Sequence, residues 1–112
     1  MPLLNINPTT TNAWEKLTTH FQEMISFSLR DAFQTDSQRK EKFSIVFDDL
    51  SLDFSKNKIE SETIDLLIEL ANEVALKEAI DKYFSGDIIN VTEDRAVLHT
   101  ALRSNSETPL LH

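Results

Sequence analysis

Residues 43–54 read FSIVFDDLSLDF, and apolar side chains stand at every second position on either side of Asp48-Asp49. A period of two is typical of β-strands with one apolar face. If Asp48-Asp49 is a two-residue turn, one face holds three apolar pairs: Phe47 with Leu50, Ile45 with Leu52, and Phe43 with Phe54. The stretch therefore predicts an antiparallel β-hairpin, with the turn type left open. Because an isolated hairpin is only marginally stable, we expect its apolar face to press on helices.

The segment before the hairpin has the period of a helix. Asn12 followed by Glu15 resembles a capping box, and apolar residues then recur at steps of three and four. This apolar stripe consists of Trp14, Leu17, Phe21, Met24 and Ile25. His20 and Glu23 lie off the stripe, so the pattern predicts an amphipathic helix that buries the stripe and leaves these two residues outside it.

A second, shorter helix is predicted immediately afterwards. Ser28 is placed to cap residues 29–33, with Asp31 in the first turn. The polar residues 34–41 predict a loop or a frayed extension of that helix. The basic side chains that follow, Arg39, Lys40 and Lys42, are diluted by nearby acidic residues and indicate a solvated loop.

Two further helices are predicted after the hairpin. A helix that begins at Ser61 or Thr63 would place four apolar side chains on one face, namely Ile64, Leu67, Ile68 and Ala71. The phase changes near Asn72, and a second stripe follows with Leu76, Ile80, Tyr83 and Phe84. Gly86, the only glycine, stands where a left-handed helix end would need it.

Residues 90–103, NVTEDRAVLHTALR, predict a last helix with Thr92 as its N-cap. On a helix, the spacing of four places Arg95, His99 and Arg103 on one stripe. Such a stripe could bind an anion, or it could meet carboxylates and carbonyl groups in protein beyond this chain. The carboxylate of Glu93 beside the first amides would repel an anion, which favours the structural role. Together, the segments predict an α+β fold, mainly helical, with about five helices and one antiparallel hairpin at residues 43–54.

The composition limits the classes of function. The 112 residues carry a net charge of −8, which disfavours nucleic acid as a partner. The apolar runs are too short to cross a membrane, and the chain has no cysteine and therefore no disulfide or thiolate site. The N-terminal residues lack the pattern of a secretory signal, so we expect a cytoplasmic protein.

The sequence predicts no metal site. The three histidines, His20, His99 and His112, are not spaced like the ligands of a helical zinc site. The aspartates near the hairpin lack the glycine and distal glutamate of a calcium-binding loop. After the hairpin, Lys56 and Asn57 could touch a ligand, although ending the strand and starting the next helix explains them better.

Three stretches resemble the N-terminal part of the glucose-6-phosphate isomerase family. They are FDDLSLDFSKNKI at residues 47–59, the helical segment at residues 64–90, and INVTEDRAVLHTALR at residues 89–103. The resemblance implies that residues 1–112 are a single N-terminal segment of a larger protein whose sugar-isomerase domains are α/β/α sandwiches. The final SETPLLH, which begins a strand and stops, also suggests a longer chain. The family motif residues to which we assign structural roles are Ser55, Lys56, Asn57, Glu93, Arg95, His99 and Arg103.

The family interconverts glucose 6-phosphate and fructose 6-phosphate without a metal or an organic cofactor. The resemblance implies proton transfer through a cis-enediol, by a glutamate, histidine, lysine and phosphate loop that lie in the sugar-isomerase domains. We assign no catalytic, cofactor-binding or metal-binding residue to this chain, and we expect it to be inactive alone. The family also implies a homodimer for the whole enzyme. The alternatives are a self-contained acidic helical module that binds a protein partner, and a small phosphosugar-binding protein.

Overall fold

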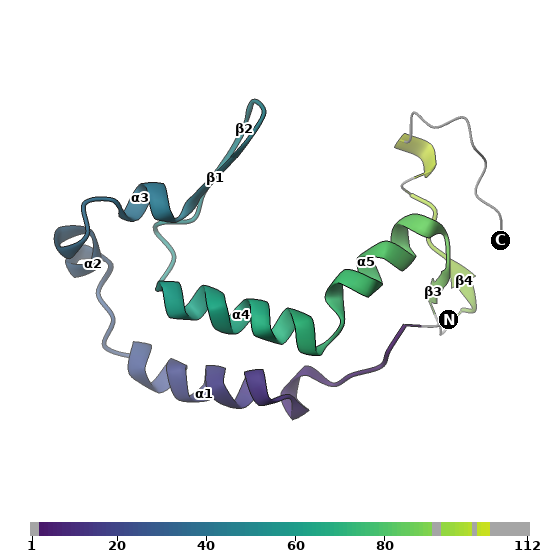
Figure 1. Cartoon of the computed structure of the whole chain (residues 1–112), viewed down its shortest axis with the longest axis horizontal. Helices are drawn as coiled ribbons and strands as arrows, with labels where there is room; N and C mark the ends of the chain where they lie inside the picture. The colour runs from purple at the N-terminus through teal and green to yellow at the C-terminus, as the bar shows by residue number, and fades with distance from the viewer. Residues whose placement is uncertain (1–2, 91–92, 100, 104–112) are drawn as a thin grey trace.

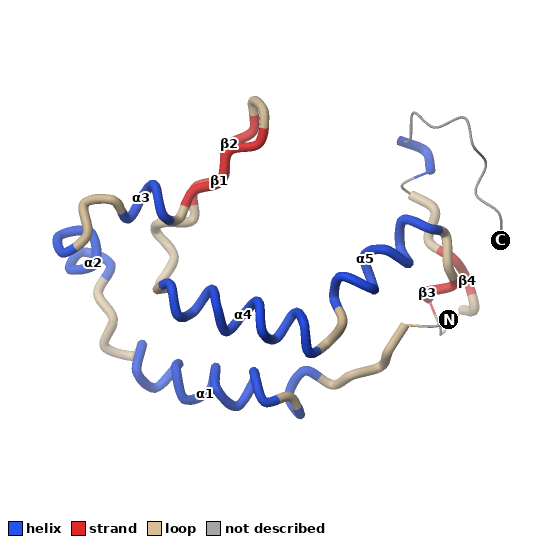
Figure 2. The backbone as a smooth tube through the Cα atoms, in the orientation of Figure 1, coloured by secondary structure: helices blue, strands red, loops and turns tan. Residues whose placement is uncertain are grey.

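The computed structural model describes residues 3–90, 93–99 and 101–103 of the chain. Five α-helices and two small antiparallel hairpins make up these residues, with two short 3-10 helices (Figure 1, Figure 2). The α-helices are α1 Asn12–Met24, α2 Leu29–Thr35, α3 Arg39–Lys42, α4 Ser61–Glu73 and α5 Leu76–Ser85. The strands are β1 Ser44–Phe47, β2 Leu50–Asp53, β3 Ile88–Asn90 and β4 Arg95–Ala96, and the 3-10 helices are η1 Pro8–Thr10 and η2 Ala101–Arg103. The predicted class, α+β and mainly helical with a hairpin, is confirmed.

Helices α1 and α4 lie side by side and run antiparallel (Figure 1). At one end of the pair, the Glu73 carboxylate of α4 accepts hydrogen bonds from the backbone N–H groups of Asn12 and Ala13, both at 3.0 Å. This carboxylate satisfies two amides that a helix N-terminus leaves without intrahelical partners. Lys16 pairs with Glu69 at 2.7 Å one turn further along. Glutamates of α4 therefore hold the start of α1.

The buried face of α1 differs from the predicted stripe. Ala13 and His20 are the buried residues of α1, with Leu17 and Met24 half-buried on the same face, whereas Trp14, Phe21 and Ile25 are exposed. The prediction that His20 lies outside the packed face was therefore wrong. Thr11, not Asn12, caps the helix through its hydroxyl, which accepts from the Trp14 N–H at 3.2 Å. An apolar stripe thus remains on the face that α4 does not cover.

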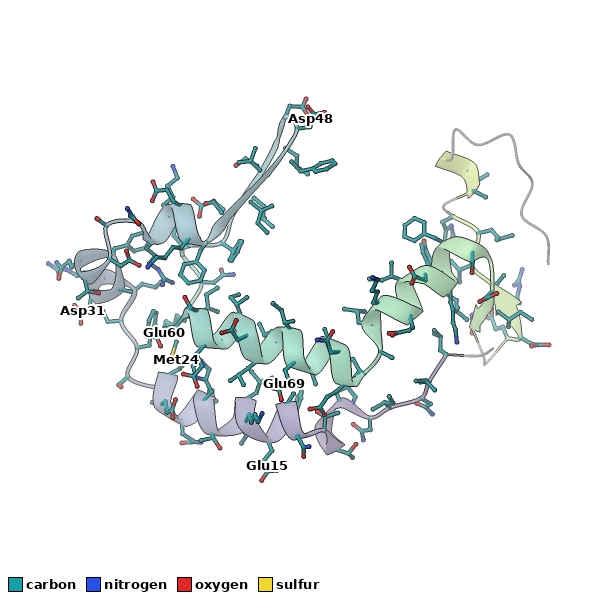
Figure 3. The ribbon with its side chains drawn as sticks, in the orientation of Figure 1. Glu15, Met24, Asp31, Asp48, Glu60 and Glu69 are labelled. Carbon is teal, nitrogen blue, oxygen red and sulfur yellow. The ribbon has the colours of Figure 1, made fainter. Side chains whose placement is uncertain are left out.

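The hairpin has the predicted register. Ile45 pairs with Leu52 and Phe47 with Leu50, and at the base the rings of Phe43 and Phe54 lie edge to face with centroids 5.9 Å apart. Asp48 at the tip of the hairpin has φ 56, so the turn contains a residue in the left-handed region (Figure 3).

The expectation that the hairpin presses its apolar face on helices was wrong. All four paired apolar side chains beyond the base are exposed, Phe47 to 77%. The hairpin projects from the end of α3 and away from α1 and α4 (Figure 1). Within the described residues, no element covers this face.

The helix predicted over residues 90–103 is also wrong. Residues 88–90 and 95–96 form a short irregular hairpin, in which Asn90 pairs with Arg95 and Ile88 with Ala96. The Asn90 side chain accepts from the Glu93 N–H at 3.3 Å and donates to the Glu93 carboxylate at 3.2 Å, and Asp94 has φ 55. Side-chain bonding to local backbone competes with helix formation, and a left-handed Asp94 cannot continue a helix. The proposed N-cap, Thr92, lies outside the described residues.

The prediction of a loop at residues 34–41 was wrong in part. Helix α2 extends to Thr35 with Ser28 as its N-cap, as predicted, and Arg39–Lys42 then form the single turn α3. Arg39 is only 4% exposed, so it is not part of a solvated loop.

The break between α4 and α5 lies at Ala75, whose backbone has a left-handed conformation with φ 57. A left-handed conformation is unfavourable for alanine and open to glycine. Gly86, with φ 82, ends α5 as predicted. We expect Ala75→Gly to raise the free energy of unfolding by about 0.5–1 kcal/mol. Ala79→Gly, inside α5, should lower it by about 1 kcal/mol, so urea titrations of the two variants should shift in opposite directions.

The molecule is thin and open. Its extents are 53 × 38 × 17 Å, and its radius of gyration is 18.7 Å, against about 13 Å for a compact domain of this length. The accessible surface is 9210 Å², against about 6,300 Å² for a compact protein of this mass. Among the described residues, the buried hydrophobic side chains are Ala13 and Phe43. No helix in the described part of the chain is both long and apolar enough to span a membrane.

Candidate functional site

The loop after the hairpin is organised around the buried side chain of Arg39. Its Nε donates to the carbonyl of Ser55 at 3.0 Å, and one terminal nitrogen donates to the carbonyls of Asn57 at 2.9 Å and Ile59 at 3.0 Å. A planar guanidinium presents its donors from three nitrogens in a fixed fork, whereas an ammonium group presents its three donors from a single atom. Arg39 therefore fixes the path of residues 55–59 between β2 and α4.

Three aromatic rings surround the same guanidinium. Its central carbon lies 4.6 Å from the ring centroid of Phe43 and 5.5 Å from those of Phe27 and Phe33. The attraction of a cation to these ring faces offsets part of the loss of hydration on burial. No carboxylate forms an ion pair with Arg39 within the described residues. Backbone carbonyls and aromatic faces supply its contacts.

The motif residues Ser55, Lys56 and Asn57 lie in the loop after β2. Ser55 is 1% exposed, and its hydroxyl and N–H both donate to one Asp53 oxygen, at 2.6 and 2.9 Å. Asn57 donates its N–H to the Phe54 carbonyl at 3.2 Å, which closes a turn. The Lys56 side chain is exposed. The Ser55 hydroxyl and the backbone groups of Ser55 and Asn57 are therefore engaged within the loop.

The two bonds from Ser55 hold the pKa of the Asp53 carboxyl below its ordinary value of 3.8. A carboxyl with a lowered folded-state pKa stabilises the fold fully above 3.8 and loses that contribution as the pH falls through the lower, folded value. We expect the protection factor of the Ser55 amide, which is the ratio of its intrinsic to its observed exchange rate, to fall in this acid range in the wild type. Asp53→Asn should exchange fast already at neutral pH and lack this acid-dependent step. A wild type with no step would contradict the assignment.

A hollow of about 470 Å³ lies between α2, α3 and the start of α4. Its lining includes the carboxylates of Asp31, Asp36, Glu60 and Glu62. Two cations also line it, but Lys42 is paired with Asp36 at 2.7 Å and Arg39 donates to the carbonyls of residues 55, 57 and 59. Because carboxylates dominate the lining, a phosphorylated sugar would be repelled there. The hollow does not support the phosphosugar-binding alternative.

The structure does not form the stripe predicted at the C-terminal end. Arg95 lies in β4 with an exposed side chain, 3.7 Å from the Glu93 carboxylate, and His99 is exposed in a turn. The backbone of Arg103 belongs to η2, and its side chain lies outside the described residues. Since the residues do not share a helix, the spacing argument for an anion site no longer holds.

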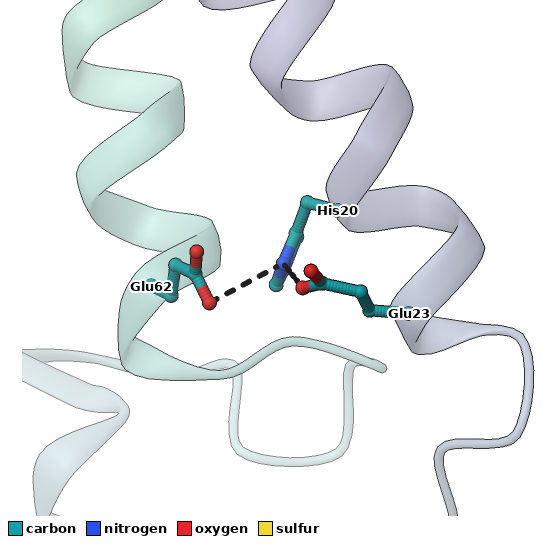
Figure 4. A group of neighbouring side chains, drawn as sticks. All are labelled: His20, Glu23 and Glu62. Atoms are coloured by element: carbon teal, nitrogen blue, oxygen red, sulfur yellow. Dashed lines mark ion pairs between the residues drawn. The ribbon is translucent and has the colours of Figure 1, made fainter.

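A second polar cluster joins α1 to α4 (Figure 4). His20 is 4% exposed, and its Nε2 lies 2.6 Å from the Thr63 hydroxyl oxygen. Its Nδ1 lies 3.5 Å from a Glu23 oxygen and 3.6 Å from a Glu62 oxygen. Thr63 also accepts from the Glu60 N–H at 3.0 Å and so caps α4. Within the described residues, the side chains of His20, Glu23 and Glu62 form a group whose possible ligand atoms lie close enough together to hold a metal ion.

Sequence reasoning missed Arg39 and His20 for different reasons. Arg39 lies in a polar run, and only the fold shows that three phenylalanines from separate segments surround it. His20 did carry a signal, because Ala13, Leu17, His20 and Met24 recur at helical steps beside the more conspicuous aromatic stripe. Glu62 belongs to another helix, so spacing within one segment could not have revealed the cluster.

Comparison with known proteins finds a matching family and similar curated proteins. A family profile described as "Phosphoglucose isomerase" matches residues 53–112, just over half of the chain. A curated protein from Christiangramia forsetii, described as glucose-6-phosphate isomerase, is 49% identical over 106 residues, which is 95% of this chain. The chain spans 20% of the length of that relative, in its N-terminal part.

Proposed function

Because the chain belongs to the phosphoglucose isomerase family, we propose that it is the N-terminal part of an enzyme that interconverts glucose 6-phosphate and fructose 6-phosphate. The reaction opens the sugar ring and moves a proton between adjacent carbons through a cis-enediol. It needs a general base and a phosphate site within hydrogen-bond reach of the substrate. We place both in the sugar-isomerase domains, and we assign no catalytic residue to this chain.

The observation that carries this proposal is the apolar surface left uncovered on all of the main elements. It includes Trp14, Phe21 and Ile25 on α1, Ile45, Phe47, Leu50 and Leu52 on the hairpin, Leu67 and Ile68 on α4, and Leu76, Ile80 and Phe84 on α5. Soluble monomers rarely expose large apolar patches, and here large apolar side chains are exposed on each of these elements. The chain matches one fifth of the length of its longer relative. The remaining domains of the same enzyme could therefore cover these apolar faces.

The hairpin and α5 rise from the same side of the α1–α4 pair, so the described chain has a U-shaped outline (Figure 1). An open outline with little core of its own suits a segment that wraps around another domain. In this role, the Arg39 cluster keeps the hairpin in position, and Glu73 and Lys16 keep α1 on α4. The chain thus contributes structure and the sugar-isomerase domains contribute chemistry.

A self-contained interaction module is the competing proposal. Such a module would need a core that holds it folded before its partner arrives. The described part of the chain has only a small hydrophobic core, because its buried hydrophobic residues are Ala13 and Phe43. We further propose a homodimeric, cytoplasmic parent enzyme that uses no organic cofactor, as in the family.

A coupled isomerase assay of the purified 112-residue chain tests the division of labour. We expect a rate equal to the uncatalysed background, because the described part of the chain brings no proton-transferring group and phosphate site together. The full-length protein, assayed at the same molar concentration, is the positive control. Turnover above background by the chain alone would overturn the proposal, whereas an inactive full-length protein would refute the assigned reaction.

A further inference from the structure

The ring of His20 has one nitrogen without a hydrogen-bond partner, although the ring is buried. Nδ1 is the buried side-chain polar atom that remains unsatisfied among the described residues. It lies 3.5 Å from Glu23 and 3.6 Å from Glu62, beyond the range of about 2.7–3.2 Å for an N–H···O bond. Buried polar atoms without partners are rare, and a bound ion is one recognised explanation.

These two separations are those expected between ligand atoms that share one metal ion. Zinc binds imidazole nitrogen and carboxylate oxygen at about 2.0–2.2 Å, and a tetrahedral arrangement then places neighbouring ligand atoms about 3.3–3.6 Å apart. All three ligand atoms already lie within 4.8 Å of one another. Small rotations of two exposed glutamate side chains would complete the geometry.

The other ring nitrogen of His20 has a hydrogen-bond partner, as is usual for a histidine that binds a metal ion. Nε2 lies 2.6 Å from the Thr63 hydroxyl oxygen, and Thr63 is itself fixed by the Glu60 N–H. If Nε2–H donates to Thr63, the lone pair of Nδ1 faces two carboxylates. Three electron-rich atoms repel one another unless a cation lies between them. A hydrogen bond from the other ring nitrogen, like the one to Thr63, orients the imidazole of metal-binding histidines.

We propose that His20, Glu23 and Glu62 bind one divalent transition-metal ion, of which zinc fits best. One imidazole and two carboxylates suit zinc, and the two carboxylate charges balance that of the ion. The side chains of Glu23 and Glu62 are 61% and 62% exposed, so the ion can enter from solvent and keep a water molecule at the fourth position. The ion links α1 to α4 at the end of the pair opposite Glu73.

The test titrates metal-free full-length protein with Zn²⁺ and with Co²⁺, whose visible absorption reports tetrahedral coordination. The variant Glu62→Gln removes one ligand from an exposed position, so it should fold normally. The control is Glu15→Gln, an exposed glutamate on α1 that points away from α4 (Figure 3). We expect the wild type and the control to bind one equivalent of Zn²⁺ that Glu62→Gln binds more than tenfold more weakly, since even an outer contact changes affinity by about 10–100-fold.

Glu23→Gln should reproduce the loss, and the tetrahedral Co²⁺ bands should disappear in both ligand variants. Zn²⁺ should also raise the melting temperature of the wild type and the control, but not that of the ligand variants. Equal Zn²⁺ binding by wild type and Glu62→Gln would overturn the proposal. Absence of the tetrahedral Co²⁺ bands in the wild type would also overturn the proposal. A proton on Nδ1, rather than a metal ion, would then supply the positive charge between the two carboxylates.

Discussion

Replacing Arg39 with methionine is expected to destabilise the segment around the hairpin by about 3–5 kcal/mol. The substitution keeps an unbranched apolar side chain beside Phe43 but removes three hydrogen bonds to the carbonyls of residues 55, 57 and 59. Those carbonyl groups would then lack their charged donor in a largely buried place. Hydrogen exchange in the full-length protein should show faster opening at the amides of Phe43 and Asn57.

Two variants make this result specific to the guanidinium. Arg39→Lys keeps the charge but carries its donors on one nitrogen instead of across a fork, so its exchange rates should lie between those of wild type and Arg39→Met. Lys40→Met removes an exposed charge from the same helix turn and should change stability by less than about 0.5 kcal/mol. Equal effects of the Arg39→Met and Lys40→Met variants would show that Arg39 does not organise the loop.

Phe47→Asp is expected to destabilise the full-length protein by about 2–4 kcal/mol while leaving the isolated chain unchanged. In the described chain, Phe47 is 77% exposed, so removing it there takes away almost no contact. If the sugar-isomerase domains cover the hairpin, the same change places a charge in a buried interface. Thermal unfolding of both proteins measures the difference.

The matched control is Ser51→Asp. Ser51 pairs with Val46 on the opposite face of the same hairpin, so it introduces the same charge without touching the apolar pairs. We expect little effect in either protein. Should Phe47→Asp and Ser51→Asp behave alike in the full-length protein, the apolar face of the hairpin is not an interface.

The sequence predicted elements whose contacts are local. Alternation around Asp48-Asp49 was sufficient for the hairpin register, because cross-strand pairing depends only on the turn between the strands. Ser28 and Gly86 marked helix ends correctly, because capping and left-handed geometry are properties of single residues. These features would hold in any surroundings.

Features that depend on distant contacts were not predictable in this way. The stripe of Trp14, Phe21 and Ile25 was expected to be buried and is exposed, because α4 packs on the adjacent face, which contains His20. The apolar face of the hairpin was expected to pack on helices and is exposed. Periodicity shows that a face is apolar, but it does not show what covers that face. In both cases the covering surface, by our proposal, belongs to the sugar-isomerase domains.

The error at residues 90–103 has a different origin. Alanine, leucine and arginine there favour a helix, but the Asn90 side chain closes a turn on Glu93, and Asp94 adopts a left-handed conformation. Short polar residues at the start of the segment therefore outweighed the helix-forming residues after them. Arg95 and His99 consequently share no helix face.

Reconstitution tests most directly whether this chain is a structural segment that docks on the catalytic domains. The 112-residue chain and the remaining polypeptide of the full-length protein are produced separately and mixed at increasing ratios, with isomerase activity followed. The account predicts an inactive chain, a weakly active or inactive remainder, and activity that rises to saturation at one chain per remainder. A remainder that is fully active alone and does not bind the chain would contradict it.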